Sequence, residues 1–64
     1  MPVVRVSMHS GRTPAQKAEL ARAITEAVVR IAKTTPEATI VIFEDVPKEN
    51  WATGGTLSSQ AAKV

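Results

Sequence analysis

The chain has 64 residues, which allows one domain, expected over residues 1–64, close to the lower size limit for a chain that folds alone. It has no cysteine for a disulfide and no Cys/His cluster for a structural metal, while its 44% of hydrophobic residues argues against disorder. A net charge of +2, dispersed along the chain, favours anionic ligands only weakly. Without a signal-peptide pattern or an apolar run that could cross a bilayer, a soluble cytoplasmic protein is expected.

The first predicted element is a strand over residues 3–8, VVRVSM. Its alternation places Val4, Val6 and Met8 on one face and Arg5 on the other, so Arg5 is expected to face solvent or an interface. The sequence HSGR then breaks the strand. His9, beside this turn, is expected to be a surface residue, with a functional role as the less favoured alternative.

A helix follows, and its start is strongly marked. Thr13 is a suitable N-cap, Pro14 suits the first helical position, and Gln16 stands three residues after the cap, as in a capping box. Pro36 cannot continue the helix, which is expected to end at the TTPE segment. The predicted packing face carries Leu20, Ile24, Ala27, Val28 and Ile31, and the solvated face carries Arg22, Glu26 and Arg30.

The second predicted strand has the core IVIF over residues 40–43 and is apolar on both faces. A strand, a helix and a strand imply an α/β fold: a β-α-β protomer with parallel strands and a right-handed crossover helix. One helix covers only one face of a two-stranded sheet. The other face, bearing either Ile40 and Ile42 or Val41 and Phe43, therefore needs a cover from outside the chain, and a second copy is the simplest candidate.

The remaining residues are predicted to form mostly irregular structure. The sequence EDVPKENWATGG, residues 44–55, indicates a loop that ends in a turn or short hairpin at Gly54 and Gly55. The tail over residues 56–64 is polar and rich in small residues. It is expected to dock on a neighbour or to fray.

No nucleophile, metal or phosphate-loop motif is present, which leaves a base and a cation. Pro2 is either a tolerated strand start or, after removal of Met1, a free secondary amine. An N-terminal amine titrates at about 7.7 to 8.0 in its reference state, a suitable range for proton abstraction beside a carbonyl. Arg12, at the turn before the helix, could hold a carboxylate and stabilise the enolate.

Three segments together resemble the 4-oxalocrotonate tautomerase family of the tautomerase superfamily: MPVVRV, then GRTPAQK, then IVIFEDVPKENWATGG. The resemblance covers nearly the whole chain and implies that pairs of protomers form four-stranded sheets and assemble as a hexameric trimer of dimers. Members tautomerise unsaturated 2-hydroxy acids such as 2-hydroxymuconate-type compounds, intermediates of aromatic degradation, without a metal or cofactor. Neither a nucleic acid nor a membrane is expected as a partner.

The resemblance also implies roles for three residues. Pro2 would be the proton shuttle, Arg12 a carboxylate-binding cation that reaches the site from a neighbouring subunit, and Trp51 the aromatic residue beside the proline, where many members have Phe. The alternative interpretations are an inert strand start for Pro2, a solvated turn residue for Arg12 and a core or interface filler for Trp51.

One departure from the family pattern concerns the substrate. The best-known members have a second arginine in the second strand, and the aligned position here is Ile40. No register over residues 39–44 supplies an arginine. The substrate then differs, or the activity is low, or a nonidentical subunit of a mixed hexamer contributes the cation.

Rival functions remain open at this point. A hydratase or dehalogenase of 3-halo acrylic acids on the same fold would need a carboxylate to activate water, and Glu44, Asp45 and Glu49 are available. A catalytically inactive homologue or a weak subunit of a mixed hexamer is a further alternative. A small DNA-binding dimer is disfavoured, because IVIF between two prolines makes a poor second helix.

Overall fold

The computed structural model describes residues 1–61 of the chain. The main elements are β1 (Val3–His9), α1 (Pro14–Ala32) and β2 (Ile40–Val46). After them come β3 (Ala52–Thr53), β4 (Thr56–Leu57) and α2 (Ser58–Ala61), and two short 3₁₀ helices, η1 (Pro36–Ala38) and η2 (Lys48–Asn50), flank β2.

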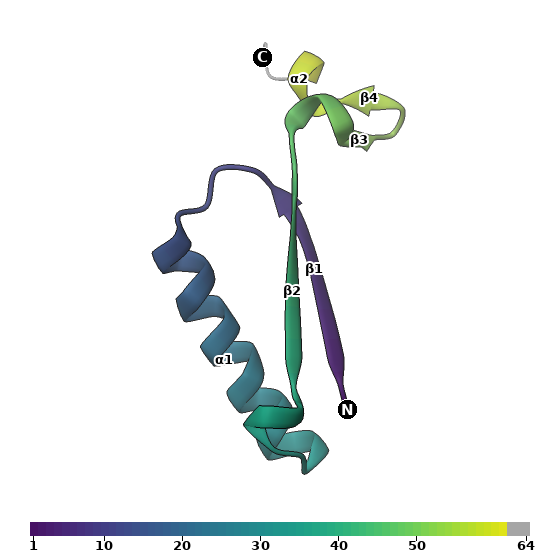
Figure 1. Ribbon diagram of the computed structural model, residues 1–64. Coiled ribbons are helices and arrows are strands. Elements are labelled where there is room, and N and C mark those ends of the chain that lie inside the picture. Colours follow the sequence, from purple (N-terminus) through teal and green to yellow (C-terminus); the bar gives the residue numbers. More distant parts are fainter. Residues whose placement is uncertain (62–64) are drawn as a thin grey trace.

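The predicted β-α-β fold is confirmed. β1 and β2 pair in parallel, from Val3 opposite Ile40 to His9 opposite Val46, and α1 joins them. Figure 1 shows α1 along one side of the two-stranded sheet. The helix packs against β2, and β1 lies beside β2 as the second strand. Both strands therefore begin at one end of the molecule and finish at the other.

The start of α1 is as predicted, and its end is earlier than predicted. The Thr13 hydroxyl accepts the Gln16 N–H at 3.1 Å, and the Gln16 side chain accepts the Thr13 N–H at 2.9 Å, which completes the capping box. The helix ends at Ala32 because Lys33 adopts a left-handed conformation with φ 60° and ψ 51°. Pro36 begins η1 and is not what stops the helix.

β2 is longer than predicted. Residues 44–46, expected in a loop, continue the strand because they pair with the last three residues of β1. Side chains reinforce this end: the Ser7 hydroxyl donates to the Glu44 carboxylate at 2.9 Å, and Lys17 of α1 forms an ion pair with Asp45. The two acidic residues are compatible with this open strand because each carboxylate reaches a polar partner.

The predicted hairpin is present. β3 and β4 pair in antiparallel fashion, and Gly54 and Gly55 connect them with φ of 60° and 85°. A two-residue turn with both φ values positive strongly favours glycine. The tail, which was expected to dock on a neighbour or to fray, is in part structured, since residues 56–61 form β4 and α2. Its last three residues, 62–64, lie outside the described part of the chain.

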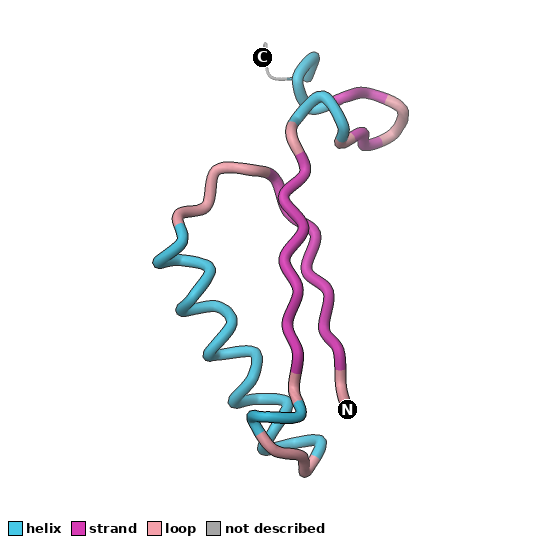
Figure 2. The backbone as a smooth tube through the Cα atoms, viewed as in Figure 1, coloured by secondary structure: helices cyan, strands magenta, loops and turns pink. Residues whose placement is uncertain are grey.

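The protomer is open and lacks a core of its own. Among the residues whose burial is described, none is fully buried. The radius of gyration is 15.0 Å, against about 11 Å for a compact domain of this length. Figure 2 shows the same extended arrangement, with the hairpin beyond the end of the sheet. A chain of this shape needs further contacts to bury its apolar surface.

The exposed apolar residues identify the uncovered surfaces. Val41 and Phe43 are half-buried, whereas Ile40 and Ile42 lie on the open face of the sheet with Val3. Of the two pairs that the sequence left open, Ile40 and Ile42 therefore lie on the uncovered face. The expected packing face of α1 is only partly packed, since Leu20 is 37% exposed and Ile31 is 68% exposed.

Candidate functional site

Pro2 lies at the amino end of the sheet. Its carbonyl accepts the backbone N–H of Ile40 at 2.9 Å, so the residue is tied to the first position of β2. Pro2 is half-buried. Its nitrogen is an amide while Met1 precedes it, and removal of the exposed Met1 would leave a secondary amine. We call Pro2 and Ile40 the amino-end pair.

Arg12 lies at the opposite end, in the loop between β1 and α1. The loop is held where the Ser10 N–H donates to the Val46 carbonyl at 3.1 Å, and Gly11 turns the chain with φ 122°. The Arg12 side chain is exposed, and within residues 1–61 it has no hydrogen bond or ion pair. Its guanidinium is therefore available to an anion beside the start of α1.

Trp51 lies at the same end as Arg12. It follows η2, is half-buried, and its carbonyl accepts the Ser58 N–H at 2.8 Å, which ties η2 to the start of α2. The indole ring meets the His9 ring edge-on, with centroids 4.6 Å apart and an interplanar angle of 73°. His9 Nε2 lies 3.3 Å from the Ser58 hydroxyl.

The prediction that His9 is a surface residue was wrong. His9 is the last residue of β1, is half-buried, and contacts both Trp51 and Ser58. Sequence reasoning ended the strand at Met8, one residue too early. Continuation of the alternation would have placed His9 on the face opposite Met8, but no local signal indicated the contact with a ring 42 positions later.

The three predicted site residues, Pro2, Arg12 and Trp51, therefore divide between the two ends of the sheet. His9, Arg12 and Trp51, here called the carboxyl-end group, lie where the strands finish, whereas the amino-end pair lies where they begin. Seven strand residues separate these ends by about 23 Å, and Figure 1 shows the N-terminus opposite the β3–β4 hairpin. One chain by itself does not bring Pro2 together with Arg12 or Trp51.

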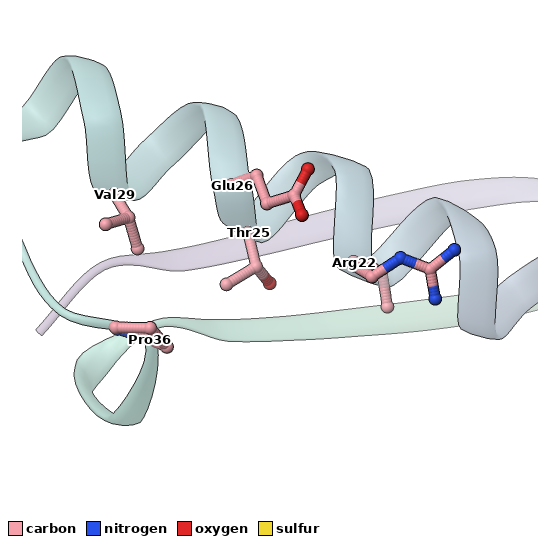
Figure 3. A pocket seen from close by; sticks show the side chains of 6 residues that line it. Arg22, Thr25, Glu26, Val29 and Pro36 are labelled. Carbon is pink, nitrogen blue, oxygen red and sulfur yellow. The ribbon is translucent and has the colours of Figure 1, made fainter.

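A groove on the surface of the protomer contains none of these residues. It has a volume of about 490 Å³ and lies along α1, where it reaches Pro36 of η1 (Figure 3). It is open to solvent, so within one protomer it is a crevice beside the helix. The lining residues are Ala21, Arg22, Thr25, Glu26, Val29 and Pro36.

The carboxylates considered for water activation differ in their surroundings. Asp45 is paired with Lys17, and Glu44 accepts from Ser7, whereas Glu49 is exposed on η2. Across the described residues, no three His, Cys, Asp or Glu side chains converge as a metal site would require. Nor does any helix of residues 1–61 have the length and hydropathy needed to span a membrane.

Known proteins of similar sequence share one description. A family model described as "Tautomerase enzyme" matches residues 2–61. A probable tautomerase of Ralstonia nicotianae is 44% identical over 57 residues, which cover 89% of this chain and 88% of the relative.

Solved structures with the same fold have related descriptions. TomN, a 4-oxalocrotonate tautomerase homologue in the tomaymycin biosynthetic pathway, superposes with a TM-score of 0.94 at 35% identity, covering 98% of this chain and 97% of TomN. A heterohexamer 4-oxalocrotonate tautomerase from Chloroflexus aurantiacus gives a TM-score of 0.88 at 33% identity, covering 94% of this chain and 97% of that one.

Proposed function

We propose that this chain, which belongs to the tautomerase family, is a keto-enol tautomerase of unsaturated 2-hydroxy and 2-oxo acids that needs no cofactor. In this proposal Pro2, freed by removal of Met1, is the general base and acid. The observation that carries the proposal is the attachment of Pro2 to Ile40 at 2.9 Å, which holds the proline ring at a defined point of the sheet. A base acts efficiently only when its position relative to the proton is fixed.

The chemistry requires that a proton leave one atom of the substrate and return to another. A secondary amine with a pKa near neutrality, as in the reference range of about 7.7 to 8.0 for amino termini, can accept and release a proton at the working pH. Apolar surroundings would favour its uncharged form. Proline is suited to this role because its ring fixes the direction of the nitrogen lone pair.

Arg12 is the proposed partner of the substrate carboxylate. Its guanidinium is exposed and lies next to Thr13, the N-cap of α1, where the helix dipole also favours negative charge. A carboxylate held in this way keeps the adjacent carbonyl in place as negative charge develops on its oxygen. Trp51 would supply an apolar wall that keeps water away from the proline.

This mechanism needs more than one subunit, because Pro2 and Arg12 lie at opposite ends of β1. We propose an oligomer, most simply a homohexamer, in which the carboxyl-end group of one copy approaches the amino-end pair of another. The open sheet face and the lack of a buried core support this proposal. A mixed hexamer, of the kind that the heterohexamer from Chloroflexus aurantiacus forms, is the alternative assembly.

The test uses protein whose Met1 has been removed, as verified by intact-mass spectrometry. Pro2→Ala is expected to lower kcat/KM for 2-hydroxymuconate by about tenfold to a hundredfold or more, the loss typical of general acid–base catalysis. The alanine amine retains some basicity, so residual activity is expected. Equal turnover by the two proteins would leave Pro2 without a catalytic role.

A matched control separates the base from the fold. Protein that retains Met1 has the same side chains but an amide at Pro2, so it is expected to be inactive while its oligomeric state is unchanged. Turnover of 3-chloroacrylate in place of the 2-hydroxy acid would favour the hydratase or dehalogenase alternative. In that case, loss of 3-chloroacrylate turnover in Glu49→Gln would identify the exposed carboxylate of η2 as the residue that activates water.

A further inference from the structure

His9 is an ionisable residue of the carboxyl-end group that the proposed function does not use. Its ring is half-buried between β1 and the segment after β2, against the edge of Trp51 and 3.3 Å from the Ser58 hydroxyl through Nε2. Within the described part of the chain, Nδ1 has no hydrogen-bond partner. One nitrogen of the ring is therefore held by the protein and the other is available to a ligand.

The contact with Ser58 allows Nδ1 of His9 to donate a hydrogen bond whether the imidazole ring is neutral or protonated. A serine hydroxyl can donate or accept. When it donates to Nε2, the neutral ring carries its hydrogen on Nδ1, and when the ring is protonated both nitrogens donate and the hydroxyl accepts. An N–H at Nδ1, beside the apolar surface of Trp51, is suited to bind an oxygen anion.

The position of His9 relative to Arg12 suggests which anion this is. The two residues are three positions apart, so their Cα atoms lie within about 10 Å. Two side chains on backbone positions this close can reach the two carboxylates of one six-carbon chain. Both residues belong to the same end of the same copy, whereas Ile40, where the family pattern has an arginine, lies at the other end.

We propose that His9 is a substrate-binding residue that donates a hydrogen bond through Nδ1 to the second carboxylate of a dicarboxylic 2-hydroxy acid, while Arg12 binds the first. The proposal rests on the function proposed above and narrows its substrate class. A protonated imidazole gives a charge-assisted hydrogen bond, which is stronger than that of the neutral ring, so a preference that increases in acid is the signature expected of a histidine donor.

The charged groups near His9 do not supply this preference by themselves. On β2, Asp45 is paired with Lys17 and Glu44 accepts from Ser7. η2 contributes Lys48 and Glu49, one of each sign, and residues 58–61 of α2 carry no charged side chain. Arg12 keeps its charge throughout this pH range, so it gives an anion affinity that is independent of pH.

The test measures binding without turnover. Calorimetric titration of the Met1-processed protein uses trans,trans-muconate and sorbate, two six-carbon dienes that differ in one carboxylate and lack the hydroxyl that reacts. At pH 5.5 muconate is expected to bind about tenfold or more tighter than sorbate, and at pH 8.5 the ratio is expected to fall to the small preference that a neutral donor gives. Failure of both ligands to bind at millimolar concentration would overturn the proposal.

Three variants identify the residue responsible. His9→Phe retains a ring against Trp51 but has no donor, and it is expected to bind the two ligands equally at both pH values. His9→Gln retains a neutral donor, so it is expected to keep a small preference that does not change with pH. Arg5→Gln removes an exposed cation elsewhere on β1 and is expected to behave like the unmodified protein.

The outcomes separate this proposal from the preceding one. If His9→Phe retains the pH-dependent preference, or if Arg5→Gln loses it, His9 has only a packing role. Turnover of 2-hydroxymuconate is measured on the same preparations. A protein that binds muconate through His9 but has no Pro2-dependent turnover contradicts the proposed function alone, whereas active protein that binds muconate and sorbate equally at pH 5.5 contradicts the role of His9 alone.

Discussion

Val3 lies directly opposite Ile40 across the parallel sheet, and the two residues are 51% and 38% exposed. Ile42, on the same face, is 37% exposed. In a 64-residue chain with no fully buried residue among those described, this face is a large part of the apolar surface that folding could remove from water. The protein is therefore expected to be stable only as an oligomer.

Sedimentation of the unmodified protein at micromolar concentration is expected to give a single species of hexameric mass. Association is expected because burial of the open sheet face and of the exposed apolar side of α1 supplies the stability that the protomer lacks, and the number of six copies is what the resemblance to the 4-oxalocrotonate tautomerase family implies. A folded monomer that persists at this concentration would refute the packing argument.

Ile42→Asp is expected to weaken the assembly by at least about a hundredfold, because an unpaired charge buried in an apolar interface costs several kcal/mol. Dilution experiments followed by sedimentation or light scattering measure the change. Arg22→Asp, on the exposed face of α1, is the matched control and is expected to leave the assembly intact. Equal dissociation of both variants would mean that the open sheet face is not an interface.

Thr13→Ala is expected to destabilise the protein by about 1 kcal/mol per protomer, because the Gln16 N–H loses the side-chain acceptor that caps α1. Urea unfolding at a fixed protomer concentration measures the effect, since oligomer stability depends on concentration. Ser59→Ala, an exposed position of α2, is the control. An unchanged midpoint for Thr13→Ala would show that water replaces the cap at no cost.

The absence of an arginine at position 40 gives a prediction about substrates. At pH 8.5, kcat/KM values for a dicarboxylic and a monocarboxylic 2-hydroxy acid are expected to differ by less than about tenfold, since a second carboxylate that sheds water without a cationic partner gains little. Ile40→Arg is expected to raise the dicarboxylate preference at least about tenfold, because it places a guanidinium next to Pro2.

A preference of about a hundredfold or more in the unmodified homogeneous protein at pH 8.5 would contradict this account of Ile40. Loss of that preference in both Arg12→Ala and Arg5→Ala would then identify Arg5 as the second cation. If Ile40→Arg leaves the ratio unchanged while the protein remains assembled and active, position 40 does not face the substrate.

The local signals in the sequence determined most of the secondary structure. Thr13, Pro14 and Gln16 act within one turn of helix, so their spacing alone predicted the capping box that the structure contains. Gly54 and Gly55 likewise act through their own φ angles, which is why the hairpin was predictable. Alternation along β1 correctly assigned Val4 and Val6 to the half-buried face and Arg5 to the exposed one.

Tertiary pairing decided what these local signals could not. Residues 44–46 have the composition of a loop, and they are a strand because β1 provides backbone partners for them. Lys33 ends α1 through its own left-handed conformation, ahead of Pro36, to which the sequence pattern had assigned that role. The choice between Ile40 and Val41 for the open face depended on which side α1 covers, which periodicity in a doubly apolar strand does not reveal.

The sequence by itself determined the residue types of the proposed site: an amine precursor at Pro2, a cation at Arg12 and an aromatic ring at Trp51. Only the tertiary structure showed that β1 separates the first from the other two and that His9 joins Trp51 and Ser58. The physical reason is that the chemistry of a residue is a local property, whereas its neighbours in space depend on strand pairing. The parallel register of the two strands brings together residues that are far apart in the sequence. It also holds others, such as Pro2 and Arg12, at opposite ends of one strand.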